Sequence, residues 1–260
     1  MKLATFQAPG REGPLAGEIV DDRVIALAEP ATVRQVLAGQ PAGRTDDAWP
    51  LSAVTLLAPI LQPGAIYCIG LNYAEHIEET GGVPLEAPIV FVKVATSVAA
   101  PGGPIRCPSV VRRLDYEGEL TVVIGAEGRI GGYCVADDVS ARDLQRREPQ
   151  WTRAKGADTF CPYGPWITTA DELPDPSDLL LRTWINGELR QESSTADMIF
   201  SCQELVDFIA ETCTLRPGDL ILTGTPSGVG MGFDPPRFLQ SGDVVRIEIE
   251  KLGAIEHAVE

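Results

Sequence analysis

Histidine is scarce in this sequence, and cysteine occurs without the close spacing of a metal or redox site. The only histidines are His76 and His257, and because His257 stands close to the last residue, we expect the imidazole chemistry of the interior to come from His76. The six cysteines are scattered and include no CxxC pair, which argues against a zinc ribbon or a dithiol redox site. We expect them to be reduced thiols, several of them buried.

Long apolar runs and an excess of basic residues are also absent. No stretch approaches the ~18 apolar residues that span a membrane, and Pro and Gly interrupt the first residues before an apolar signal segment develops. Lys and Arg number 21 against 37 Asp and Glu, a formal net charge of −16. This charge argues against nucleic acid or an anionic membrane as partner. From the missing signal segment and membrane span we predict a cytoplasmic protein.

The order of turn residues and apolar segments predicts two domains. Residues 1–58 indicate a small β-rich domain with strands at LATF, GEIV and RVIAL, a helix at TVRQVLAG closed by Gly39, and an irregular stretch, QPAGRTDDAWP. Residues 59–260 consist mainly of short β segments between Pro and Gly turns, with helices at NYAEHIEETGG and SCQELVDFIAET. The second helix starts with a capping box formed by Ser201 and Glu204. This balance predicts a β-rich α+β fold and argues against a doubly wound sheet.

Three acidic residues alternate in LDYEGELTVV, a segment that otherwise predicts a β-strand. Successive side chains of a strand point to opposite faces, so Asp115, Glu117 and Glu119 are expected on one face. Cα atoms two positions apart would lie roughly 7 Å from each other, close enough for two carboxylates to bind one cation. An edge strand that exposes charges against mispairing would show the same alternation, so this segment alone supports either interpretation.

Two further aspartates end the strand predicted in GYCVADD. One of them could complete an oxygen cluster with Glu117 and Glu119. Three carboxylates without Cys or His nearby form a hard ligand set, which suits Mg²⁺ or Mn²⁺ and suits zinc poorly. The acidic strand is therefore also a candidate metal site.

A candidate general base lies on the helix predicted at NYAEHIEETGG, which Asn72 would cap and Gly81 would end. His76 and Glu79 are three positions apart and therefore share a helix face, where Glu79 could orient the imidazole and raise its basicity. A surface histidine beside a solvated glutamate would have the same spacing. The spacing alone permits a catalytic dyad without establishing one.

Two loops supply further polar groups. Lys155 lies in QWTRAKGADTFCPYGPW, where an ammonium could stabilise a developing enolate or oxyanion, although most single lysines are simply exposed. The loop LTGTPSGVGMG offers backbone N–H groups and the Thr225 hydroxyl, as anion-binding loops do. It lacks the GK[ST] ending of a P-loop, so a nucleotide site is poorly supported.

Six segments, in order along the chain, resemble the fumarylacetoacetate hydrolase family: GLNYAEHIEE, LDYEGELTVVIG, DDVSARDLQ, KGADTFCPYGPW, STADMIF and PGDLILTGTPSGVG. The resemblance runs from about residue 66 to 255 and is to bacterial members of the 2-hydroxyhepta-2,4-diene-1,7-dioate isomerase or acylpyruvate hydrolase type, whose small N-terminal region residues 1–58 resemble. It implies a mixed β-sandwich roll that binds one Mg²⁺ or Mn²⁺ and forms a homodimer. It also implies an enzyme that cleaves or rearranges carbon–carbon bonds next to a 2-keto acid.

Carried over residue by residue, the resemblance implies three kinds of site residue. Asp115 matches no ligand position, and Lys93 is given no role because Val94 replaces the proline that follows this lysine in many relatives. The implied metal ligands are Glu117, Glu119 and Asp138; the implied catalytic groups are His76, Glu79 and Lys155; and the implied substrate-binding groups are Arg142, Gln145 and Thr225.

The leading hypothesis is a Mg²⁺-dependent hydrolase that cleaves a carbon–carbon bond of acylpyruvates or related 2,4-diketo acids in the catabolism of aromatic or sugar acids. A 2-keto acid can chelate the cation, Lys155 can stabilise the enolate that cleavage produces, and His76 can activate a water. Decarboxylation of oxaloacetate-type acids and keto–enol isomerisation of 2-hydroxydienoates are alternatives, because these reactions pass through the same kind of enolate.

Two further hypotheses assign the protein a function outside this enzyme family. A non-catalytic protein with structural Ca²⁺ in the acidic cluster predicts metal-dependent stability without turnover, but the sequence contains no EF-hand-like loop. An oxidoreductase that uses the glycine-rich loop predicts NAD binding, which calorimetry would detect.

Overall fold

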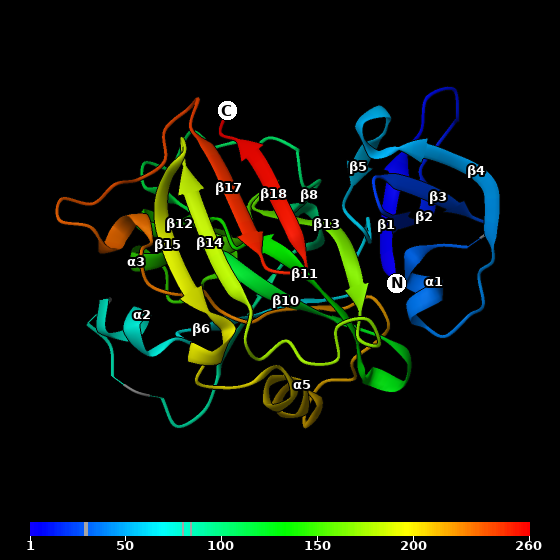
Figure 1. The fold of residues 1–260 in the computed structure, drawn as a ribbon. Coiled ribbons are helices and arrows are strands. Elements are labelled where there is room, and N and C mark those ends of the chain that lie inside the picture. Colours follow the sequence, from blue (N-terminus) through cyan, green and yellow to red (C-terminus); the bar gives the residue numbers. More distant parts are fainter. Residues whose placement is uncertain (29–30, 80, 84) are drawn as a thin grey trace.

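The N-terminal strands form an antiparallel meander beside a short helix in the computed structural model, which describes residues 1–28, 31–79, 81–83 and 85–260 (Figure 1). These elements are β1 (Lys2–Gln7), β2 (Leu15–Val20), β3 (Arg23–Leu27), α1 (Val33–Leu37), β4 (Arg44–Pro50) and β5 (Thr55–Leu57). One edge of β1 pairs with β2, and β3 and β4 follow in order. Thr32 caps α1 in a capping box with Gln35, and Gly39 follows the helix with a φ of 84°, which confirms the predicted helix.

The irregular conformation predicted for QPAGRTDDAWP is wrong for residues 44–50, which form the edge strand β4. This segment pairs with β3 through the backbone, for example between Ile25 and Ala48. Its aspartates and its proline give it the composition of a turn, and most of its side chains are exposed or half-buried. On an edge strand such residues are tolerated because one side of the strand needs no partner.

The meander continues into one 12-stranded mixed sheet, because β1 also pairs with the longest central strand, β13 (Cys161–Thr169). The division of the chain at residue 58 into two domains stays a prediction. Beyond β13, the sheet comprises β11 (Ile130–Asp137), β10 (Gly118–Ile124), β16 (Leu220–Leu222), β6 (Ile66–Gly70) and β7 (Ile89–Lys93), in this order, with the short β8 (Val98–Ala99) beside β13. These neighbours are antiparallel except for the parallel pairs of β16 with β6 and of β13 with β8.

A second, four-stranded sheet packs over the first and closes the core. It consists of β15 (Glu188–Ser194), β14 (Leu180–Ile185), β17 (Val244–Ile249) and β18 (Gly253–Ala258), in this order. In β17, Val245, Ile247 and Ile249 are fully buried and share a hydrophobic cluster with Leu120 and Val122 of β10. Burial of each such side chain contributes about 1.5–3 kcal/mol. The two packed sheets confirm the predicted β-rich α+β fold, a mixed β-sandwich roll (Figure 1).

Four helices lie around the sandwich: α2 (Ala74–Glu79), α3 (Arg142–Arg147), α4 (Thr152–Lys155) and α5 (Cys202–Ala210). The capping box of α5 forms between Ser201 and Glu204, as predicted. The predicted N-cap of α2 is wrong, because the helix begins at Ala74, two residues after Asn72, and the Asn72 side chain binds elsewhere. Its side-chain amide instead donates to the carbonyls of Phe200 and Thr223 and thereby ties together loops distant in sequence.

The structure also shows the state of the cysteines and the length of the helices. The six cysteines are free, and four of them are buried. Within the described ranges, the helices are all too short or too polar to cross a membrane.

Candidate active site

Three buried carboxylates converge at the end of the central sheet. One oxygen from each of Glu117, Glu119 and Asp138 lies within 4.8 Å of the other two, and the residues are 5%, 1% and 0% exposed. Two hydrogen bonds hold Glu117 beside the end of β11: the Asp138 N–H donates to the Glu117 carbonyl at 2.9 Å, and the Glu117 N–H donates to the side-chain Oδ1 of Asp137 at 2.8 Å. The pairing of β10 with β11 therefore builds the cluster.

The continuous strand predicted over LDYEGELTVV is interrupted. One strand, β9 (Leu114–Asp115), pairs with β12 (Ser140–Ala141), and β10 begins only at Gly118. The interruption lies at residues 116–117, where the chain passes from one sheet to the other. Glu117 is therefore placed by its backbone contacts with residues 137 and 138, and regular strand geometry places only Glu119.

The electrostatics of the cluster favour a bound cation. Burial, together with Asp138 and Glu117, raises the pKa of Glu119 well above its ordinary value. Glu119 Oε2 accepts a hydrogen bond from the Gly224 N–H at 2.7 Å, whereas Oε1 is buried without a hydrogen-bond partner in the described part of the chain. An oxygen in this position is costly unless it binds a proton or a cation.

Two lysines reach the cluster from different elements. Lys155 Nζ of α4 donates to Glu117 Oε2 at 2.6 Å and to Asp138 Oδ2 at 2.9 Å. Burial lowers the pKa of Lys155, but Asp138 and Glu117 outweigh this effect and the net shift is upward. Lys93 Nζ donates to Asp138 Oδ1, so the lysine that we set aside in the sequence lies at the cluster. The feature of the sequence that could have indicated this buried position is a lysine inside the apolar run IVFVKV.

Arg142 connects the carboxylate cluster to a further carboxylate, that of Asp115. Its Nε donates to Asp115 Oδ2 at 2.8 Å, and its Nη2 lies 2.6 Å from Glu117 Oε1. Burial opposes the ionisation of Glu117, but Arg142 and Lys155 outweigh it and lower the pKa of Glu117 to about 2. Asp115 also accepts hydrogen bonds from the N–H groups of Gly230 and residue 231, so its oxygens are occupied within the protein.

The His76–Glu79 pair forms in the structure. His76 Nδ1 lies 2.9 Å from Glu79 Oε2, and the two side chains are 6% and 15% exposed. The Gly228 N–H donates to Glu79 Oε1 at 2.8 Å. A Cβ added at Gly232 would overlap the same carboxylate, so any other residue there would displace Glu79 from its present position. The N–H groups that we interpreted as typical of an anion-binding loop thus bind carboxylates of the protein itself.

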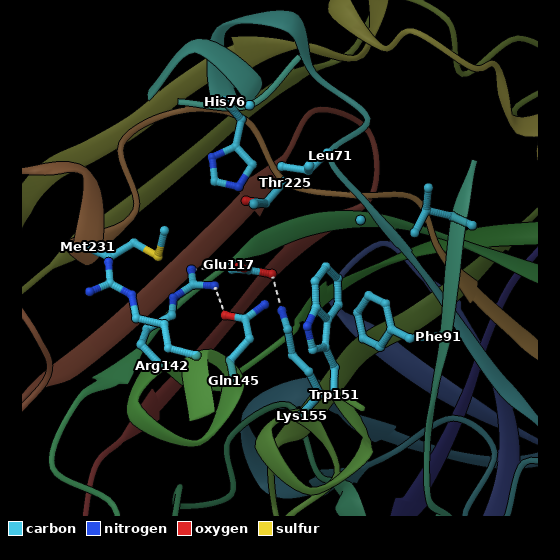
Figure 2. Close-up of a pocket in the computed structure, with 14 residues that line it drawn as sticks. Leu71, His76, Phe91, Glu117, Arg142, Gln145, Trp151, Lys155, Thr225 and Met231 are labelled. Carbon is cyan, nitrogen blue, oxygen red and sulfur yellow. Dashed lines mark hydrogen bonds and ion pairs between the residues drawn. The ribbon is translucent and has the colours of Figure 1, made fainter. Parts of the chain in front are cut away.

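A cavity of about 320 Å³ opens above the cluster (Figure 2). Figure 2 shows His76 pointing into it from α2, opposite Arg142 and Gln145 on α3. Gln145 Oε1 accepts from Arg142 Nη1 at 3.0 Å, and the Thr225 hydroxyl donates to the Gly118 carbonyl. Six of the nine predicted site residues line the cavity, whereas Glu79, Glu119 and Asp138 do not. Its walls are Ile69, Gly70, Leu71, His76, Gly82, Phe91, Glu117, Arg142, Gln145, Arg146, Trp151, Lys155, Thr225 and Met231.

A second buried histidine contradicts the expectation that only His76 would serve the interior. His257 is 2% exposed, and its Nε2 lies 2.9 Å from Asp137 Oδ2. The other oxygen of Asp137 accepts the Glu117 N–H, so His257 supports a predicted metal ligand through one intermediate residue. The alternation of Ile255, His257 and Val259, all buried, was the signal in the sequence.

Comparisons with known proteins agree with this geometry. A family model described as "Fumarylacetoacetate (FAA) hydrolase C-terminal" matches residues 65–260. The mitochondrial oxaloacetate tautomerase of Rattus norvegicus is 40% identical over 286 residues, covering 100% of this chain and 91% of the relative. The structure of 5-carboxymethyl-2-hydroxymuconate delta-isomerase from Mycobacterium smegmatis has a TM-score of 0.85 at 38% identity, covering 100% of this chain and 99% of its own. Fumarylacetoacetate hydrolase from psychrophilic Exiguobacterium antarcticum gives 0.88 at 36% identity, with coverages of 100% and 99%.

Proposed function

The chain belongs to the fumarylacetoacetate hydrolase family of enzymes, and on this premise we propose that it catalyses the keto–enol tautomerisation of a small 2-keto acid with a bound divalent cation. This reaction was an alternative in our interpretation of the sequence, behind the hydrolysis of acylpyruvates. Two relatives named as a tautomerase and an isomerase now favour it. The observation that carries the proposal is that His76 of a histidine–carboxylate dyad and Glu117 of a buried carboxylate triad line the same cavity.

The residues at the cluster fit a divalent cation. Glu117, Glu119 and Asp138 would hold it, and the unpartnered Glu119 Oε1 offers a ligand atom that the described residues leave unused. Oxygen ligands alone favour Mg²⁺ or Mn²⁺. When bound, the cation would act as a Lewis acid that withdraws electron density from the keto oxygen of a 2-keto acid.

The side chains of the protein supply the proton transfers. Glu79 binds His76 Nδ1, so Nε2, on the other side of the ring, is the atom that removes a proton from C3 of the keto acid. Lys155 Nζ stabilises the charge that develops on the oxygen at C2, and the proton that His76 took from C3 passes to that oxygen and completes the enol. Gln145 accepts from Arg142 through Oε1, which leaves its amide NH₂ group to donate to the substrate.

Hydrolysis of acylpyruvates is the second candidate. The same dyad could activate a water in place of removing a proton from carbon, and one of the related structures is named a hydrolase. Decarboxylation of an oxaloacetate-type acid would develop an enolate at the same position. All three reactions would use the dyad, Lys155 and the carboxylate triad.

The test follows three reactions in parallel. Enol absorbance of oxaloacetate reports tautomerisation, pyruvate formation from oxaloacetate reports decarboxylation, and loss of acetylpyruvate absorbance reports hydrolysis, each with Mg²⁺ and with EDTA. We expect Mg²⁺ to accelerate the interconversion of enol and keto forms. The variant Glu119→Gln should lose this acceleration, and Glu12→Gln, at an exposed position, should keep it. Acetylpyruvate cleavage without tautomerisation would replace the proposal by the hydrolase candidate.

We also propose that the enzyme is a cytoplasmic homodimer that acts on small molecules. The family resemblance supports the dimer, and the net charge of −16 supports the absence of nucleic-acid and membrane partners. Light scattering coupled to size exclusion would measure the oligomeric state directly.

A further inference from the structure

Arg146 is a cation at the cavity that none of the roles above uses. It lines the cavity and is exposed, and among the described residues its side chain has no hydrogen-bonding, ion-pair or ring partner. The other two long cationic side chains in the wall, Arg142 and Lys155, are both bound to carboxylates of the protein. The charge of Arg146 is therefore available to a ligand.

The geometry of α3 places Arg146 farther from the metal cluster than Arg142. Residues 142, 145 and 146 have the spacing of one helix face, and all three line the cavity. Four residues of an α-helix rise about 6 Å. Arg142 is 3% exposed, whereas Gln145 is half-buried and Arg146 is exposed. This helix face therefore leads from the buried carboxylates to the open end of the cavity.

Apolar side chains in the wall suit a short carbon chain. Phe91, Trp151 and Met231 contribute apolar surface to the cavity. Figure 2 shows Met231 beside Arg142, on the α3 side of the cavity, whereas Trp151 and Phe91 lie on the other side of Lys155. A substrate with its keto-acid group at the carboxylate cluster and its far end toward Arg146 would therefore place its middle carbons near Met231.

We propose that Arg146 binds a second carboxylate at the far end of the substrate, so that the enzyme selects 2-keto dicarboxylates over 2-keto monocarboxylates. This inference rests on the proposed function, which assigns the keto-acid end to the metal cluster. A guanidinium group donates two parallel hydrogen bonds to a carboxylate and retains its charge at all physiological pH values. Because Arg146 is exposed, the effect is expected to be moderate, about five- to tenfold in affinity.

Matched pairs of 2-keto acids test the inference by equilibrium binding. Calorimetry in excess Mg²⁺ compares 2-oxoglutarate with 2-oxopentanoate, and 2-oxoadipate with 2-oxohexanoate, so that each pair differs only in the terminal group. We expect the wild type to bind at least one dicarboxylate about five- to tenfold more tightly than its partner. Arg146→Gln should abolish that preference and leave the affinity for the monocarboxylates unchanged.

Arg147→Gln is the matched control. Arg147 lies on the same helix, is exposed, and does not line the cavity. The substitution Arg147→Gln removes the same charge as Arg146→Gln but at a position outside the cavity. The Arg147→Gln variant should therefore keep the preference for dicarboxylates. Equal binding within both pairs by the wild type, or equal losses in the two variants, would overturn the role of Arg146 and leave the proposed function intact. Failure of all four acids to bind the Mg²⁺-loaded protein would overturn the proposed function and, with it, this inference.

Discussion

The substitution Glu119→Gln removes the buried carboxyl whose pKa is raised by burial, Asp138 and Glu117. Without a cation, the native state keeps a proton on Glu119 at pH values at which the unfolded chain has lost it. The free energy of unfolding therefore falls as pH rises above the unfolded pKa, by about 1.4 kcal/mol per pH unit, until the raised native pKa is reached. The Gln variant lacks this slope and should be more stable than the metal-free wild type at neutral pH.

A bound cation should reverse this order. At about one hundred times its Kd, Mg²⁺ stabilises the native state by about 2.7 kcal/mol, because it binds the folded protein alone. For a domain of this size the gain corresponds to about 5–10 °C in Tm. The Glu119→Gln variant lacks one of the three carboxylates proposed to bind the cation. Its gain in stability with Mg²⁺ should therefore be close to zero.

Denaturant unfolding at pH 5.5, 6.5 and 7.5, with EDTA or with MgCl₂, measures both effects. Asp115 also has a raised pKa, because burial outweighs its contact with Arg142, but it contributes equally to both proteins and cancels in the difference. The exposed variant Glu12→Gln controls for the loss of one acidic group. Identical pH slopes for the wild type and Glu119→Gln, or equal gains with Mg²⁺, would refute the reasoning.

Three further predictions concern the groups around the cavity. Lys93→Met should lower the free energy of unfolding in EDTA by about 3–5 kcal/mol, since it leaves the buried charge of Asp138 less compensated. In denaturant titrations Mg²⁺ should restore part of this loss. A loss below about 1 kcal/mol would argue against a stabilising pair of Lys93 and Asp138. His76→Ala should lower kcat for tautomerisation at least about 100-fold, in stopped-flow measurements of enol absorbance; an unchanged kcat would exclude His76 as the base. His257→Ala should destabilise the protein by about 1–3 kcal/mol in urea, because one oxygen of Asp137 loses its buried partner; no change would show that the pair contributes nothing net.

Local patterns predicted much of this fold, because local physics determines the features concerned. The caps of α1 and α5, at Thr32 and Ser201, satisfy backbone groups within a few residues of themselves. The alternation in β17 reflects burial of one face. By contrast, Asn72 looked like a cap, but its side chain binds backbone groups of residues 200 and 223. Contacts over such sequence distances leave no periodic signal.

The adjacent residues Asp137 and Asp138 show that local patterns also leave part of the site unpredicted. Asp138 contributes an oxygen to the carboxylate cluster, while Asp137 turns to the Glu117 N–H and to His257. Periodicity predicts that neighbours on a strand face opposite sides, but it does not say which side holds the site. Only the family resemblance distinguished them. Neither it nor the periodicity indicated the contact with His257, because that contact joins β18 of one sheet to β11 of the other.

The pairing of β1 with β13 bears on how the protein avoids aggregation. Lys2 and Leu3 occupy part of an edge of β13 that would otherwise offer unpaired N–H and C=O groups beside a fully buried apolar strand face. Such an edge is a template on which strands of other molecules can add. The first strand of the chain thus shields the sheet, and a protein shortened to residues 59–260 would be prone to aggregate through β13 even if its cavity kept its shape.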